Sequence, residues 1–187
     1  MREEFEKALA YHCAPALAGI KAGNLISCSK EKYPDFREMI MLYQNAMKDK
    51  GICFEILHEC DRNYLLFMYR RNVLKGHLEK KEIRGLLLQA GYPPFGTLEE
   101  MISCLKLRFS KDQEFPHEIG VFLGYPPQDI LGFRENHGRN YKLCGHWKVY
   151  GDVEEAKRMF QQFDKCRSGI CRRLSEGITL TQMFCPA

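Results

Sequence analysis

Two apolar runs in the first half of the chain, joined by a short segment, constrain the fold most strongly. Ile52–His58 and Tyr64–Tyr69 are rich in β-branched, aromatic and aliphatic residues, and only residues 59–63 separate them. This pattern predicts a β-hairpin with a moderately long loop. The second run is apolar at successive positions and not only at alternate ones. It therefore predicts a central strand that is buried on both faces.

Helical spacing of apolar residues dominates the rest of the sequence. From Phe5 to Ile20 the spacing is helical, but Pro15 interrupts it, so either one helix kinks or a second helix starts at Pro15. Thr97 and Glu100 predict a capping box, and Asp152 predicts the cap of a long helix. Further helices are expected at about 34–50, 73–78, 80–90 and 127–136.

These elements together predict an α+β fold. We expect a small, mostly antiparallel sheet, built from the 52–69 hairpin and a short buried strand at Ile119–Leu123, and covered by several helices. Leu25–Ser29 and Leu143–Tyr150 are predicted to be extended. A chain of 187 residues fits one compact domain, 1–187, with a loose tail at about 179–187.

Charge and hydropathy limit the partners of the chain. No apolar run approaches the roughly 20 residues that cross a bilayer, and the acidic, amphipathic N-terminus lacks the features of a signal peptide. We therefore expect a cytoplasmic protein without a membrane partner. The net charge is +4, and residues 134–173 hold ten basic and five acidic residues. This excess could attract an anionic ligand, but it is too mild to predict nucleic-acid binding, and a solvated helix face is the simpler explanation.

Nine cysteines are present, and the absence of an export signal predicts reduced thiols, most of them buried. Their spacing does not predict a metal site. His12, His117, His137, Cys144 and His146 do not form the two paired ligand sets that a closed zinc site requires. We therefore predict no metal site, and the sequence leaves any cofactor unidentified.

Several distinctive motifs carry a family resemblance over nearly the whole chain. They are HCAPALAG (12–19), EFPHEIGVFLGYP (114–126) and LCGHWKVYGD (143–152). On these motifs the chain resembles an uncharacterised bacterial family, domain of unknown function 3793. The resemblance implies a bacterial origin, but no reaction, cofactor or partner.

One candidate site pairs Cys13 with His117. If a helix starts at Pro15, Cys13 lies just before its N-terminus, where the helix dipole and free N–H groups stabilise a thiolate. His117 would act as the base and Cys13 as the nucleophile, with Glu118, Asp129 or Asn136 orienting the imidazole. The alternative is that Cys13 is a core residue and His117 a turn residue.

A second candidate site is an aromatic, partly cationic cleft within residues 115–150. Aromatic walls with a few cations suit a small anionic or planar organic ligand. The alternative is that the aromatic residues form core. Five aromatic residues are expected to line the cleft, and three cations to lie at its mouth: Tyr92, Tyr125, Phe133, Tyr141 and Trp147, and Arg134, Arg139 and Lys142. The ligand-binding residues that we predict are Tyr125, Phe133, Arg134, Arg139, Lys142 and Trp147.

The sequence thus leaves three functions open, and it does not decide whether the protein is an enzyme. The first is a binding or regulatory protein that uses the aromatic cleft. The second is a thiol-dependent hydrolase or transferase that uses Cys13 and His117. The third is a protein–protein interaction module, which would expose a large apolar patch.

Overall fold

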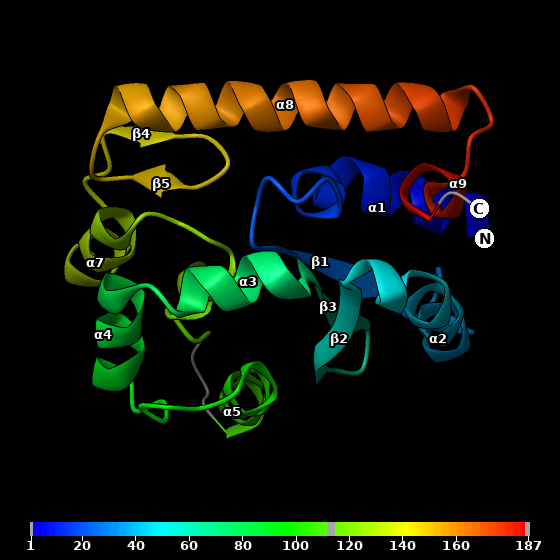
Figure 1. The fold of residues 1–187 in the computed structure, drawn as a ribbon. Helices are drawn as coiled ribbons and strands as arrows, with labels where there is room; N and C mark the ends of the chain where they lie inside the picture. The colour runs from blue at the N-terminus through cyan, green and yellow to red at the C-terminus, as the bar shows by residue number, and fades with distance from the viewer. Residues whose placement is uncertain (1, 112–114, 186–187) are drawn as a thin grey trace. The chain divides into compact units, whose positions relative to one another are not determined.

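The computed structural model describes residues 2–111 and 115–185. Its helices and strands are α1 (Arg2–Leu17), β1 (Gly23–Ser29), α2 (Phe36–Met47), the 3-10 helix η1 (Lys48–Lys50), β2 (Ile52–Glu59), β3 (Asn63–Arg70), α3 (Arg71–Leu78), α4 (Lys81–Gln89), α5 (Leu98–Lys111), α6 (Ile119–Phe122), α7 (Pro127–Glu135), β4 (Leu143–Cys144), β5 (Lys148–Val149), α8 (Val153–Ser175) and α9 (Leu180–Phe184) (Figure 1). Helices accompanied by a small antiparallel sheet confirm the predicted α+β class.

The chain divides into two compact units. Unit 1 comprises residues 1–74 and 163–187, and unit 2 comprises residues 75–162. Helix α8 contributes residues to both units. The expectation of a single domain stays a prediction, and one cooperative unfolding transition would support it.

The sheet of unit 1 has the strand order β1-β3-β2, and both pairings are antiparallel (Figure 1). The hairpin and the central place of its second strand, β3, are confirmed. Leu66 and Met68 of β3 pack in the core cluster, and Phe67 and Tyr69, which alternate with them, are buried as well. Alternate residues point to opposite faces of a strand, so β3 is apolar on both faces.

The third strand of this sheet is β1, and the prediction of a strand at residues 119–123 is wrong. Residues Ile119–Phe122 form the single helical turn α6, which Gly124 follows with φ +75°. A short apolar run has no periodicity that separates a buried helical turn from a buried strand. The expected extended region at 143–150 contains the two-stranded ribbon β4-β5.

Helix α1 passes through Pro15 without interruption, so no second helix starts there. A proline inside a helix costs about 3 kcal/mol. Helix α1 packs against β1 and β3, and Leu9, Ala14 and Leu17 are fully buried. We attribute the continuity of the helix to this packing, since burial in a tertiary structure commonly overrides local propensity.

The C-terminal segment is not loose over its described part. Thr179 and Gln182 form a reciprocal capping box at the start of α9. Leu180 is fully buried, and its N–H donates to the buried carboxylate of Glu6 at 3.2 Å. Helix α9 contacts both α1 and α2. Residues 186 and 187 of the predicted tail lie outside the described residues.

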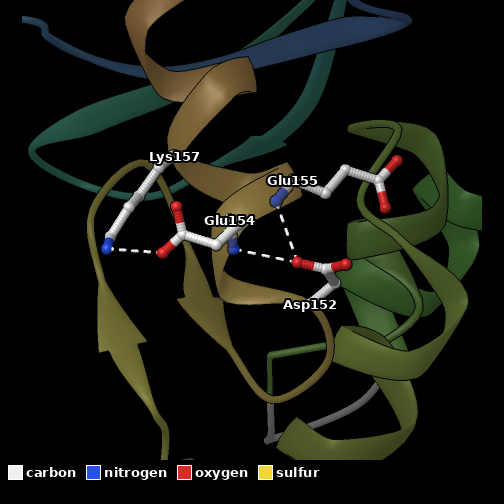
Figure 2. A network of polar contacts seen from close by, with 4 residues as sticks. All are labelled: Asp152, Glu154, Glu155 and Lys157. Atoms are coloured by element: carbon white, nitrogen blue, oxygen red, sulfur yellow. Dashed lines mark hydrogen bonds and ion pairs between the residues drawn. The ribbon is translucent and has the colours of Figure 1, made fainter.

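Both predicted helix caps are confirmed. Asp152 Oδ1 accepts the backbone N–H groups of Glu154 and Glu155 at 2.9 Å each, and Lys157 pairs with Glu154 at 2.8 Å (Figure 2). At the start of α5, Thr97 and Glu100 exchange the two hydrogen bonds of a capping box. These caps satisfy N–H groups that have no partner inside a helix.

In the described parts of the chain, none of the helices is both long enough and apolar enough to cross a membrane.

Candidate functional site

A cavity of about 320 Å³ lies within unit 2, and residues from five neighbouring segments line it. Phe115 and His117 precede α6, which contributes Ile119 and Gly120. Helix α7 contributes Asp129, Ile130 and Phe133. Tyr125 lines the cavity from the turn before α7, and Trp147 and Lys148 do so from the β4-β5 ribbon. The volume falls in the range of roughly 300–1,000 Å³ that is typical of small-molecule pockets.

The aromatic lining is held in a fixed arrangement. The Tyr125 and Trp147 rings stack at 5.1 Å with 28° between their planes. Phe160 of α8 meets Trp147 edge-on at 4.5 Å, and Gly145 leaves room for the Phe160 ring. Trp147 is 7% exposed, and burial raises the pKa of the Tyr125 hydroxyl to about 12. These ring contacts therefore hold Tyr125 and Trp147, which both line the cavity, in place.

The buried carboxylate of Asp129 holds the Trp147 ring in place through a hydrogen bond. Asp129 is 4% exposed, and its carboxylate accepts three hydrogen bonds. Oδ2 accepts Trp147 Nε1–H at 2.6 Å, and Oδ1 accepts the backbone N–H groups of Tyr150 and Gly151 at 2.7 Å each. A buried carboxylate is tolerated when it is bonded in this way, and charge-assisted bonds are the stronger class. Asp129 therefore ties α7 to the β4-β5 ribbon.

Three of the six predicted ligand-binding residues line the cavity. They are Tyr125, Phe133 and Trp147. The three predicted cations are exposed and are not among the lining residues: Arg134, Arg139 and Lys142. Of these, Lys142 donates from Nζ to the carbonyl of Gly151 at 3.0 Å.

The cation that lines the cavity is Lys148, which the sequence reasoning missed. Its Nζ donates to the carbonyl of Gly138 at 2.8 Å and lies 5.8 Å from the Phe133 ring and 5.1 Å from the Tyr141 ring. The available signal was its place next to Trp147 in an extended segment. That signal does not separate Lys148 from the nearby basic residues.

His117 is exposed beside the cavity, with its ring 5.6 Å from that of Phe133. Glu118, its predicted partner, is engaged elsewhere, because Oε1 accepts Tyr92 Oη–H at 3.3 Å and pairs with Arg108 at 3.3 Å. Burial is the main cause that raises the pKa of Tyr92, with Glu118 adding to it. Tyr92 and Glu118 thus belong to a polar cluster whose members do not line the cavity.

Cys13 lies in unit 1, in the last turns of α1, with no exposed surface. A helix start at Pro15 would have stabilised its thiolate, but α1 does not start there. Burial instead raises the pKa of the Cys13 thiol to about 12. These features favour the core alternative for Cys13, while its catalytic role stays a prediction.

All nine cysteines are free thiols. Over residues 2–111 and 115–185, no group of three or more His, Cys, Asp or Glu side chains is placed to hold a metal ion.

Comparison with known proteins gives one match. A family model described as "Protein of unknown function (DUF3793)" matches residues 9–184. No curated protein and no solved structure matches the chain.

Proposed function

The chain belongs to the family described as "Protein of unknown function (DUF3793)", and we propose from the geometry of unit 2 that the protein binds a small, planar organic molecule. The observation that carries the proposal is the cavity with the stacked Tyr125 and Trp147 rings in its lining. An apolar cavity with a few placed polar groups is the usual form of a ligand site.

The polar groups of the cavity support binding rather than catalysis. The carboxylate of Asp129 is occupied by three donors from the protein itself. His117, Lys148 and Tyr125 are the other ionisable residues in the lining, and no cysteine, serine or threonine is among the described residues that line it. A mechanism with a cysteine, serine or threonine nucleophile needs that side chain within hydrogen-bond reach of its base.

The two other predicted functions receive less support. A thiol enzyme needs an accessible thiol of low pKa, whereas Cys13 is buried and its pKa is raised. The most exposed large apolar side chain is Phe95, which is 87% exposed. The exposed large apolar residues are distributed over several elements, with Met41 and Leu42 adjacent on α2, and these positions do not by themselves define a docking surface. The nine free cysteines support the proposed cytoplasmic location, since thiols stay reduced there.

The test uses the single tryptophan of the chain. Trp147 lines the cavity, so its fluorescence reports on occupancy directly. We expect one- and two-ring aromatic compounds to shift or quench this emission in a saturable way. The Ile130→Phe variant, which adds bulk inside the cavity, should weaken binding at least about tenfold, the effect of roughly 1.4 kcal/mol.

Ile20→Phe is the matched control, because it makes the same change at an isoleucine that is 48% exposed and lies in unit 1. This control should bind as the wild type does. Equal affinities for the wild type, Ile130→Phe and Ile20→Phe would refute the site, as would the absence of any saturable change.

A further inference from the structure

We infer that the ligand of this cavity is an aromatic anion of one or two rings, and that Lys148 binds its anionic group. The inference rests on the proposed function and adds to it the chemical class of the ligand and the residue that selects it.

Lys148 is held at the cavity with bonding capacity left over. An ammonium group has three N–H donors, and in the described part of the chain Nζ makes one hydrogen bond, to Gly138 O at 2.8 Å. The Phe133 and Tyr141 rings lie 5.8 and 5.1 Å from Nζ, which places the charge near both ring faces. Lys148 thus has donors to offer an anion without breaking the contact that positions it.

The loop after α7 is built to make that contact. Gly138 has φ +71°, and an added Cβ would lie 3.1 Å from the Phe133 ring and 3.4 Å from Lys148 Nζ. The flanking residues His137 and Asn140 also have positive φ angles, of 48° and 56°. Non-glycine residues adopt this conformation uncommonly, and they keep it where the surrounding structure fixes them. The loop therefore brings the Gly138 carbonyl to the ammonium and fixes its position.

Asp129 does not reverse the charge preference of the cavity. Both of its oxygens are bonded to protein donors, at 2.6 and 2.7 Å. These bonds stabilise the carboxylate and hold it toward Trp147 and Tyr150. Lys148 lines the cavity and makes one of its three possible hydrogen bonds, so it is the cation that we expect to decide the charge preference.

The size of the cavity sets the size of the ligand. An apolar cavity of about 150 Å³ accommodates benzene, and this cavity has about 320 Å³. It therefore has room for two fused rings. Tyr125 and Trp147, which both line the cavity, offer aromatic surface to such a ring system.

Three naphthalene probes of nearly equal size separate ring binding from charge recognition. They are naphthalene-2-carboxylate, its neutral carboxamide and the cationic naphthalen-2-ylmethylammonium, each titrated by calorimetry. We expect the carboxylate to bind the wild type about tenfold or more tighter than the carboxamide, as one charge-assisted hydrogen bond allows. Lys148→Met should remove this advantage, weakening carboxylate binding about tenfold or more and carboxamide binding less, because a neutral carbonyl accepts a weaker hydrogen bond from an ammonium group than a carboxylate does.

Lys142→Met is the control, because Lys142 is exposed and does not line the cavity. It should leave all three affinities unchanged. A rise in ionic strength from 0.05 to 0.5 M should weaken carboxylate binding to the wild type and spare the carboxamide. This salt test needs no variant, so it stands even if Lys148→Met does not fold.

The outcomes distinguish the two proposals. Equal binding of carboxylate and carboxamide, tightest binding of the cation, or an equal loss of all three in Lys148→Met would overturn the inference and leave the binding function standing. If none of the three probes binds, the proposed function fails for ligands of this size and the inference fails with it.

Discussion

Two glycines in helices of unit 2 should respond to the same substitution with opposite signs. Gly132 lies in α7, where an added Cβ would sit 2.4 Å from both Cβ and Cγ of Tyr150. Carbon atoms prefer separations of about 3.5–4.0 Å, so the overlap exceeds about 1 Å. The Tyr150 Cβ cannot move alone, because the backbone N–H of Tyr150 is bonded to Asp129 Oδ1 at 2.7 Å. Relief therefore requires a shift of the backbone that carries the ribbon.

The expected magnitudes follow from two opposing contributions. Overpacking costs about 1–3 kcal/mol, and glycine to alanine inside a helix gains about 0.5–1 kcal/mol. Gly132→Ala should therefore lower the free energy of unfolding by about 1–2 kcal/mol. Gly85 lies in α4 with no atom within 4 Å of an added Cβ. Gly85→Ala should accordingly raise this free energy by about 0.5–1 kcal/mol.

Urea unfolding followed by both Trp147 fluorescence and far-UV circular dichroism measures the two changes. A Gly132→Ala variant that is as stable as the wild type would refute the packing of α7 against Tyr150. The same experiment tests the expectation of a single domain. Trp147 reports on unit 2 and dichroism on the whole chain, so coincident transitions would support one cooperative unit.

Two further predictions concern the buried ionisable groups. Asp129→Asn should destabilise the chain by about 2–4 kcal/mol, because the indole N–H would lose its charged acceptor and two backbone hydrogen bonds would weaken. The control is Asp152→Asn, an exposed helix cap for which asparagine serves equally well, and it should change the free energy of unfolding little in the same urea titration. Equal effects of the two substitutions would contradict this explanation. Burial raises the pKa of the Cys13 thiol from its ordinary value of 9.0 to about 12, so above pH 9.0 the thiol ionises in the unfolded chain before it does so in the folded one. The contribution of Cys13 to the free energy of unfolding should therefore be lost between pH 9.0 and about 12. Cys13→Ala should reduce this loss of stability at high pH. Peptide mapping after alkylation at pH 8 should find the exposed Cys60 and Cys144 modified and Cys13 unmodified. Rapid alkylation of Cys13 would argue for the thiol enzyme instead.

Sequence reasoning succeeded where one local pattern decides the structure. The runs 52–58 and 64–69 predicted the hairpin and its central strand, because a strand buried on both faces must be apolar at successive positions. Asp152 and Thr97 predicted helix starts, because unpaired N–H groups at a helix start need a nearby acceptor.

Sequence reasoning was wrong, or left alternatives open, where contacts between distant residues determine the structure. Helix α9 depends on its capping box and on the bond from Leu180 N–H to Glu6, which lies at the other end of the chain. The path of α1 through Pro15 depends on packing against the sheet. Local propensity contains neither contact, so it predicted a loose tail and left a second helix start open.

The candidate site shows the same division between aromatic and charged residues. Large aromatic rings are commonly buried, and three of those within residues 115–150 that we predicted to bind a ligand line the cavity: Tyr125, Phe133 and Trp147. A lysine gives no such signal, because its charged end stays in water by default. Lys148 lines the cavity, whereas Lys142, six residues earlier, is exposed. The difference arises because a loop with three positive φ angles presents the Gly138 carbonyl to Lys148. The charge that we expect to select the ligand is thus set by the backbone geometry of the 136–140 loop, which the number of basic residues nearby does not reveal.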